Sequence, residues 1–159
     1  MLEILELLEK DSRITVSEIA VRLGKTEEEV QKCIREYEKQ GVIVGYTTMI
    51  DWEKTARENV TALIEVKITP QQLEGFDRAA ERIYKFPEVT SCYLMSGGFD
   101  LTVIIEGATL KEVAMFVSQK LAPLESVLST STHFVLKKYK DKGRMFGQSE
   151  TDGREAIFL

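Results

Sequence analysis

The chain has few of the residues from which metal centres, disulfide networks and acid–base sites are built. Among its 159 residues are two cysteines, Cys33 and Cys92, and one histidine, His133. Metal sites and disulfide frameworks need several such residues at short, recurring spacings. We therefore expect no metal site, no disulfide and no cofactor. The sequence also lacks a phosphate-binding glycine loop and a recognisable nucleophile–base pair, so we predict that the protein is not an enzyme.

Long apolar runs are missing as well. Hydrophobic residues make up 43% of the chain, which is enough for packed cores. However, no uninterrupted stretch approaches the roughly 20 apolar residues of a membrane span. The first ten residues alternate acidic and apolar side chains and lack the basic flank of a secretory signal. We predict a cytoplasmic protein, and its length and amphipathic segments favour two small domains.

Basic residues are also fewer than acidic residues. The net charge is −5, and the first 50 residues contain seven Lys or Arg against ten Asp or Glu, a net −3. Neutralisation of phosphates supplies most non-specific affinity for DNA, and a basic footprint is the usual mark of a DNA-binding domain. Any affinity for DNA must therefore come from a few well-placed cations, multiplied by several copies in one assembly.

The amino-terminal part nevertheless has the pattern of a helix-turn-helix unit. Thr15 with Glu18, and Thr26 with Glu29, fit the capping box, in which a hydroxyl and a carboxylate satisfy the unpaired amides of a helix start. Gly24 lies between the two boxes, where a residue without Cβ ends a helix in a left-handed conformation. We predict two helices that cross at a short turn, as in DNA-reading proteins.

Apolar residues recur at helical spacings through this part of the chain. We expect a short first helix, a second over 16–23 and a third over 27–40, with Gly41 closing the third. The apolar faces are Ile4, Leu5 and Leu8; Ile19, Ala20 and Leu23; and Val30, Ile34 and Tyr37. A helical hairpin that only packs or dimerises has the same pattern, so the residues alone leave DNA binding open.

The carboxy-terminal part changes to a strand period and follows the order β-α-β-β-α-β. The alternation of apolar and polar residues over 60–69 is typical of a half-buried strand. The other expected elements are a helix from Pro70 to near Phe86, strands over 89–95 and 99–105, a helix that begins at a third capping box, Thr109 with Glu112, and a strand over 127–138. This order predicts the ferredoxin-like fold, an antiparallel sheet with both helices on one face. A second copy is the simplest cover for the other face.

Three short motifs resemble the amino-terminal signature of the Lrp/AsnC (leucine-responsive, feast/famine) family of transcription regulators. They are Asp11-Ser12-Arg13-Ile14, Glu18-Ile19-Ala20 and the run GVIVGY at 41–46. The resemblance implies an α+β protein with an amino-terminal helix-turn-helix domain and a βαββαβ ferredoxin-like regulatory domain. It also implies binding to double-stranded DNA, response to an amino-acid effector, and dimers that assemble further, often as octamers.

We divide the chain into four segments on these grounds. Residues 1–44 form the helix-turn-helix domain, 45–59 a connecting strand and linker, 60–138 the domain for effector binding and oligomerisation, and 139–159 a tail. The tail is rich in charge and glycine but ends in Ala-Ile-Phe-Leu. Two interpretations stay open for it: a disordered end, or a strap whose apolar end docks on a partner subunit.

The segment 96–100 is the most distinctive part of the carboxy-terminal domain. Its two glycines expose backbone groups and its aspartate adds a carboxylate, so the set can hold the two charges of a free amino acid. A plain tight hairpin explains the same letters. The family resemblance implies that this stretch lines the effector pocket at an interface between dimers, together with paired threonines of the last strand. The predicted effector-binding residues are therefore Ser96, Gly97, Gly98, Phe99, Asp100, Thr130 and Thr132.

The third helix carries the predicted DNA contacts, which are Lys25, Thr26, Gln31, Lys32 and Arg35. Glutamine can read adenine, and lysine or arginine can reach guanine or phosphate. The sequence departs from the family pattern in two places: Cys33 stands where arginine is usual, and three glutamates occupy 27–29, where they repel phosphate. The alternative function is an acidic amino-acid-binding or assembly module that has lost specific DNA binding.

Overall fold

The computed structural model describes residues 2–69 and 75–147 of the chain. The predicted helix start at Pro70, its apolar residue Leu73 and the apolar end of the tail lie outside the described residues. The chain divides into two compact units between Ile50 and Asp51. We describe each unit by itself.

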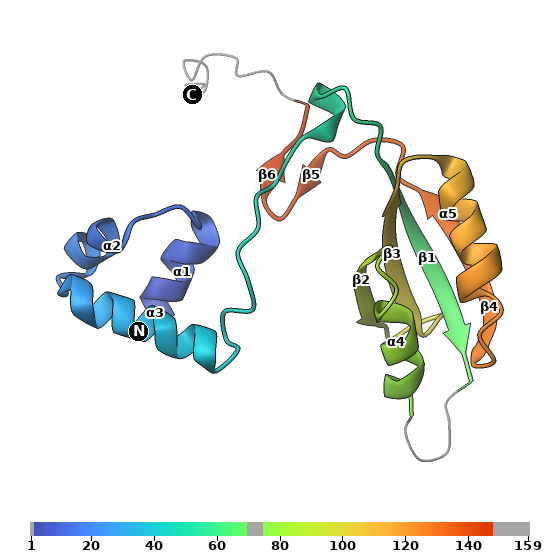
Figure 1. The fold of residues 1–159 in the computed structure, drawn as a ribbon, viewed down its shortest axis with the longest axis horizontal. Coiled ribbons are helices and arrows are strands. Elements are labelled where there is room, and N and C mark those ends of the chain that lie inside the picture. Colours follow the sequence, from blue (N-terminus) through green and yellow to red (C-terminus); the bar gives the residue numbers. More distant parts are fainter. Residues whose placement is uncertain (1, 70–74, 148–159) are drawn as a thin grey trace, which may run out of the picture. The chain divides into compact units, whose positions relative to one another are not determined.

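The amino-terminal unit consists of three helices, as the sequence predicts. They are α1 (Leu2–Lys10), α2 (Val16–Leu23) and α3 (Glu27–Lys39) (Figure 1). Its core is formed by residues from all three helices, of which five are buried: Ile4, Ile19, Ala20, Val30 and Cys33. Burying one isoleucine or valine side chain contributes about 1.5–3 kcal/mol to folding stability. Small Ala20 lies in this core, where it allows close packing of α2.

Both predicted capping boxes are closed in the structure. At α2, the Thr15 amide and hydroxyl donate to Glu18 Oε2 at 2.9 and 2.8 Å, and the Glu18 amide donates to Thr15 Oγ1 at 3.2 Å. The same three bonds join Thr26 and Glu29 at 2.9, 2.9 and 3.2 Å. Gly24 has φ +61°, and the following amide donates back to Ala20 O at 2.9 Å. These local bonds fix where α2 begins and ends and where α3 begins.

The predicted connecting strand has no strand partner among the described residues of this chain. Residues 44–51 are extended without strand pairing, and a short 3-10 turn follows at Trp52–Lys54. Val44 is 95% exposed. A β-strand needs a neighbour to satisfy its amides and carbonyls, and no described strand of the chain pairs with this segment. The sequence has the β-branched composition of a strand, but composition alone does not supply a partner.

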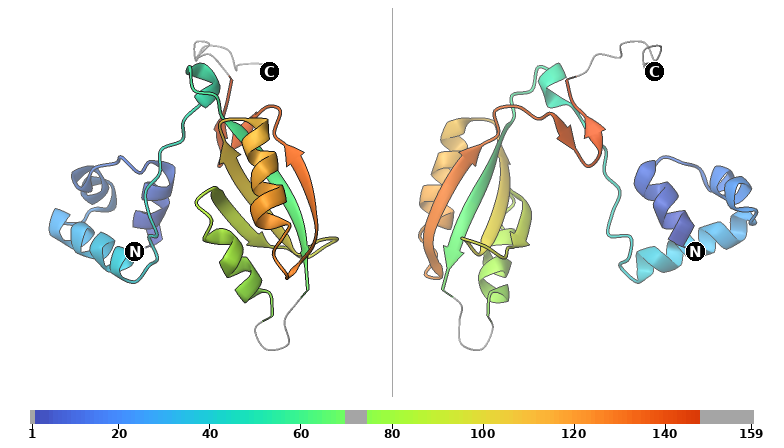
Figure 2. Two further views of the ribbon diagram at one scale, coloured as in Figure 1. Left: turned by 45° about the vertical axis from the view of Figure 1, so that its right-hand side comes forward. Right: turned by 180° about the vertical axis from the view of Figure 1, so that it is seen from behind.

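The carboxy-terminal unit has the predicted ferredoxin-like order. Its elements are β1 (Val60–Ile68), α4 (Asp77–Tyr84), β2 (Val89–Leu94), β3 (Leu101–Gly107), α5 (Leu110–Phe116) with a π-turn at Val117–Leu121, and β4 (Val127–Phe134). The sheet order is β2-β3-β1-β4, and every neighbouring pair is antiparallel. Both helices cover one face of the sheet, and among the described elements of this unit none covers the opposite face (Figures 1 and 2).

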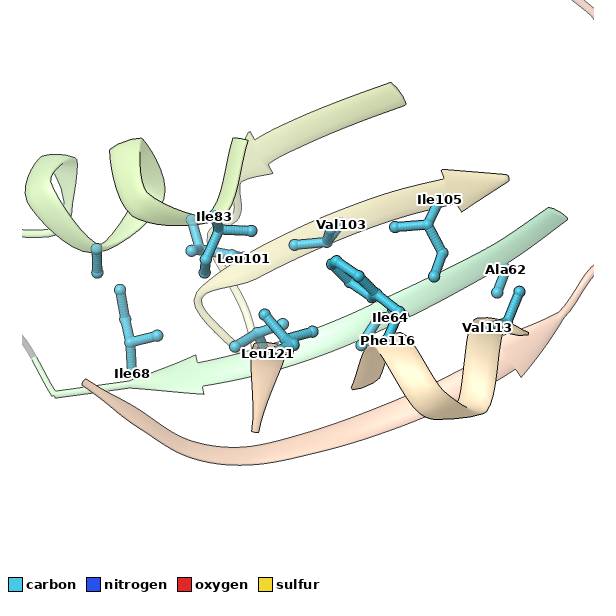
Figure 3. Close-up of a cluster of buried hydrophobic side chains, with 12 residues drawn as sticks. Ala62, Ile64, Ile68, Ile83, Leu101, Val103, Ile105, Val113, Phe116 and Leu121 are labelled. Carbon is cyan, nitrogen blue, oxygen red and sulfur yellow. The ribbon is translucent and has the colours of Figure 1, made fainter. Parts of the chain in front are cut away.

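The core of this unit lies between the sheet and its two helices (Figure 3). The central strand β1 points Ala62, Ile64, Val66 and Ile68 into it, and none of these is more than 3% exposed. Across the sheet, Ile64 is opposite Val103. The strand alternation read from the sequence therefore fixes which face is buried.

Two predicted boundaries and one predicted cap differ from the structure. Strand β3 begins at Leu101 rather than at 99, and β4 ends at Phe134 rather than at 138. At α5 the Glu112 amide donates to Thr109 Oγ1 at 3.1 Å, but the Glu112 carboxylate accepts from the amide of Ala108. The second half of the predicted capping box is thus shifted by one residue, to the amide before the N-cap.

The first part of the tail is ordered as a small hairpin, which neither interpretation of the sequence predicted. Strands β5 (Lys140–Asp141) and β6 (Arg144–Met145) pair across a two-residue turn. The turn residues Lys142 and Gly143 have φ +42° and +80°, the signs required by a type I′ turn. In the described ranges, no helix is long and apolar enough to cross a membrane.

Candidate functional sites

Helix α3 separates a buried face from an outward face that carries the predicted DNA contacts. Val30 and Cys33 are 0% and 5% exposed and face the core. Gln31, Lys32 and Arg35 are all exposed. At 3.6 residues per turn, Lys32 and Arg35 lie opposite the buried stripe, while Gln31 lies at its flank.

Lys39 belongs to the same outward face and is absent from the residues predicted from sequence. It is exposed and follows Arg35 by four residues and Lys32 by seven, spacings that place the three cations in one row. This spacing is visible in the sequence and could have identified Lys39, although it lies at the opposite end of α3 from the predicted contacts Lys25 and Thr26.

Cys33 lies in the core of the helical unit and not on the DNA-facing surface that the sequence suggested. The family pattern suggests that this cysteine replaces a DNA-facing arginine, but its side chain is buried in the core of the helical unit. The departure from the family pattern therefore changes the packing of α3 and removes no cation from the exposed face. The predicted apolar stripe was Val30, Ile34 and Tyr37, whereas the fully buried positions are Val30 and Cys33.

At the start of α3, some residues are held by the capping box and others are not. The Thr26 hydroxyl is held in the capping box, and Lys25 is exposed before it. The Thr26 amide and hydroxyl donate to Glu29 and lower the pKa of that carboxyl. Within the described chain, Glu27 and Glu28 are exposed and have no such hydrogen bond. They are the two negative charges at this helix start that the cap does not use.

Tyr46 ties the connector to the end of α3. Its hydroxyl donates to Glu38 Oε1 at 3.0 Å. Partial burial and then this hydrogen bond to a carboxylate raise the pKa of Tyr46. The sequence shows Tyr46 only as the last residue of the GVIVGY motif, and the structure assigns it the role of an anchor.

The glycine-containing loop 95–100 joins β2 to β3 and is closed by Asp100. The Met95 amide donates to Asp100 O at 2.8 Å, and the Asp100 amide donates to Val66 O at 3.0 Å. Asp100 Oδ2 accepts a hydrogen bond of 2.8 Å from the Ile68 amide. One carboxylate oxygen thus has a structural role that the sequence does not predict, since it depends on a strand 32 residues earlier.

The tip of this loop is open. Ser96, Gly97 and Gly98 are exposed, while Phe99 and Asp100 are half-buried. A Cβ built on either glycine would meet no atom within 4 Å. The single chain therefore leaves room at the tip for a ligand or for a partner subunit.

The two candidate threonines lie on β4, which flanks β1 on the side away from β3. Thr130 is opposite Val66 and Thr132 is opposite Ile64, so both point to the helix-covered side and are partly buried. The structure brings Thr130 to the same end of the sheet as Asp100, two strands away, a separation of about 10 Å. Thr132 lies one step further from that end.

The uncovered sheet face combines apolar and charged residues. Leu63 is opposite Ile104 on one side and His133 on the other, and Leu63 and Ile104 are partly buried. His133 Nε2 is 3.5 Å from Glu65 Oε1. This face is partly apolar, as expected of a surface that is covered in an assembly.

A hollow of about 280 Å³ lies at the far end of β3 from the glycine loop and is lined by no predicted site residue. Ile105, Val113 and Phe116 form its apolar wall. At its rim Lys120 forms an ion pair with Glu88, which lowers the pKa of that carboxyl. In the described ranges no three His, Cys, Asp or Glu side chains come together as a metal site would require.

Comparison with protein families gives matches over both units. Residues 1–44 match the model described as winged helix-turn-helix DNA-binding, and residues 61–145 match the Lrp/AsnC ligand binding domain. An uncharacterized HTH-type transcriptional regulator of Bacillus subtilis, YugG, is 51% identical over 156 residues, covering 98% of this chain and 94% of its own.

Two more distant proteins extend the comparison. The HTH-type transcriptional regulator LrpA of Pyrococcus horikoshii is 33% identical over 137 residues, covering 86% of this chain and 94% of its own. A crystal structure of the transcriptional regulator NMB0573 of Neisseria meningitidis in complex with L-Met has a TM-score of 0.69 and 24% identity, covering 87% of this chain and 88% of that one.

Proposed function

This chain belongs to the Lrp/AsnC family of DNA-binding transcription regulators, and on that premise we propose that it is an oligomer whose operator binding responds to an amino acid. Membership in a family of regulators agrees with the prediction that the chain is not an enzyme. The carboxy-terminal unit is a ligand-binding domain of the Lrp/AsnC type. The proposal adds the identity of the ligand and the response of the oligomer to it.

The observation that carries the proposal is the exposed row of cations on α3. Lys32, Arg35 and Lys39 are exposed on the face opposite the core, with Gln31 beside them. We propose that this face enters the major groove, where arginine and lysine recognise guanine and glutamine recognises adenine. Lys25 and Thr26 lie at the start of the same helix, where phosphate contacts are expected.

The amino-acid effector is proposed from the chemistry of the loop 96–100 and its neighbours. The exposed backbone of Gly97 and Gly98 can hold a carboxylate. Oδ2 of Asp100 is occupied by the Ile68 amide, which leaves the other oxygen for an ammonium group. Ser96 and Phe99 flank the pair, and we include Thr130 and Thr132 of β4 in the proposed site. The complex of NMB0573 with L-Met supports an amino acid as the ligand class.

The oligomer is proposed from the uncovered face of the sheet. Partly buried Leu63 and Ile104 form an apolar strip there, with the Glu65–His133 pair beside it. A second copy would cover the strip, and such dimers could assemble further through the open loops. An effector that binds one arrangement of subunits better than another then shifts the population and changes DNA affinity.

The decisive test is a salt series of binding to the DNA upstream of the protein's own gene. Specific binding that weakens steeply with salt supports a regulator that uses α3. If no specific complex forms even at low salt, the better description is an acidic amino-acid-binding or assembly module that has lost DNA affinity, an outcome that the net −3 charge of residues 1–50 makes worth testing.

A further inference from the structure

The segment 137–145, which contains the β5–β6 hairpin, is the most basic part of this acidic protein. Its sequence KKYKDKGRM contains five Lys or Arg and one Asp, a net charge of +4, whereas residues 1–50 carry net −3. The unit that holds the recognition helix therefore lacks the positive charge that holds a protein on DNA, and this hairpin has an excess of it. None of the sites described above uses these residues.

The lysines of the hairpin differ in how they are held. Lys138 is 3.8 Å from Asp141 Oδ2 and 5.3 Å from the Phe146 ring centroid, and Lys137 lies over the Tyr139 ring at 5.1 Å. By contrast, the side chains of Lys140 and Lys142 are exposed and meet no acidic or hydrogen-bonding partner in the part of the chain that the structure describes. These two charges are available to an external anion.

Lys142 also occupies a position that does not suit lysine. It is the first residue of the type I′ turn, with φ +42°, the only non-glycine residue with positive φ among residues 2–69 and 75–147. Asparagine, aspartate and glycine are the usual residues there because side chains with a Cβ and no local hydrogen bond are strained in the left-handed region. A lysine at the tip is strained and has no side-chain partner within the described chain, which favours a role in contact with another molecule.

We propose that this hairpin contacts the phosphate backbone of double-stranded DNA, with Lys140 and Lys142 as the contacting residues. The inference rests on the proposed function, because that function supplies the anion. A row of exposed cations beside the exposed Tyr139 ring suits a polyanion, and phosphate contacts of this kind carry no sequence information. The hairpin would supply the non-specific affinity that the acidic helical unit lacks.

The first test measures binding of the full-length protein to a 30-base-pair duplex of random sequence over a range of salt concentrations. The double variant Lys140→Gln with Lys142→Gln should lower the slope of log affinity against log salt by about 0.9 for each phosphate that the variant no longer neutralises. The matched control, Arg82→Gln with Lys111→Gln, removes one exposed cation from α4 and one from α5 and should leave the slope near that of the parent. Equal slopes for parent and hairpin variant would overturn the proposal.

The second test uses the strain at the tip. Lys142→Asn fits the left-handed turn better, so we expect an unchanged or higher melting temperature together with a salt slope lower by about one. Loss of DNA affinity without loss of stability supports a contact. A more stable variant with unchanged affinity overturns it.

The upstream DNA of the gene separates this inference from the proposed function. If Arg35→Ala abolishes specific binding and the hairpin variants keep the parental salt slope, α3 reads DNA and the inference is wrong. If the parent forms no specific complex but the hairpin variants lose affinity for the random duplex, the proposed function is wrong and the inference stands. Loss of binding to anionic phospholipid vesicles, with DNA binding intact, would assign the hairpin to a membrane surface and overturn it.

Discussion

The two units of this chain are specified at different ranges of sequence. In the helical unit, each capping box joins residues three apart, and Gly24 ends α2 through a bond to Ala20. In the sheet unit, the central strand pairs with β3 and with β4, and Asp100 reaches Ile68. Because the bonds of the first unit are local, its structure can be predicted from the sequence. In the second unit, pairings between distant residues determine the structural roles of individual side chains.

The largest expected effect is on the sheet core, where Ile64 is fully buried. Ile64→Ala should destabilise the carboxy-terminal unit by about 2–5 kcal/mol because it leaves a cavity. Ile19→Ala is the matched change in the helical unit. Calorimetry should show that each variant lowers the melting transition of its own unit. One shared transition that moves with both variants would contradict the division at residue 50.

Arg35→Ala should have the next largest effect, on DNA binding rather than on folding. Specific affinity should fall by about 1–3 kcal/mol if the guanidinium reads a base, while a phosphate contact would instead lower the salt slope by about one. Lys39→Ala tests the extension of the cation row. Unchanged binding for Arg35→Ala, Lys32→Ala and Lys39→Ala would remove α3 from the interface.

Asp100 allows the structural and ligand roles of one residue to be separated. Asp100→Ala leaves the Ile68 amide without its acceptor and should cost about 1–3 kcal/mol of stability. Asp100→Asn retains an acceptor and should fold nearly as well, yet bind the effector more weakly because the charge is gone. Calorimetric titration after an amino-acid screen measures the second effect. If the Asp100→Asn variant binds the effector as tightly as the parent does, Asp100 has only its structural role.

Thr26→Ala tests the local bonds of the helical unit. Loss of the cap should cost about 0.5–2 kcal/mol. It should also weaken the pH dependence, because the cap holds the pKa of Glu29 below its ordinary value of 4.5. A lowered folded pKa gives stability that is present above 4.5 and is lost as the pH falls through the folded value. The stability difference between parent and variant, measured by melting curves from neutral to acidic pH, should therefore shrink toward the acidic end without vanishing, because the bond from the Glu29 amide to Thr26 Oγ1 does not titrate.

The smallest expected effect comes from charge alone. Replacing Glu27 and Glu28 by glutamine should leave folding almost unchanged, because Thr26 and Glu29 keep the cap. It should raise affinity for random DNA at low salt by removing repulsion from phosphate. Glu53→Gln with Glu58→Gln, outside α3, serves as the control. No rise relative to that control would mean that the helix start does not face the backbone.

Much of the fold could be predicted because its signals are periodic or local. The bounds of α2 agree with the prediction, and the alternation along β1 identified the buried face correctly. Cys33 could not be placed, since a small side chain beside an apolar stripe suits either face. The role of Asp100 was beyond reach because Ile68 is distant in sequence. The hairpin at 140–145 was missed because its turn places a lysine where asparagine or glycine is the usual signal.

The bond from the Ile68 amide to Asp100 also affects how relatives should be compared. The carboxylate stands in for a backbone carbonyl one step beyond the start of β3, so it extends the ladder of the central strand. Selection for folding alone would keep an acceptor at this position, even in a relative that binds no amino acid. Conservation of this aspartate in an alignment is therefore not evidence of sensing. An exchange of Asp for Asn between relatives is more informative, because it preserves the ladder and removes only the charge.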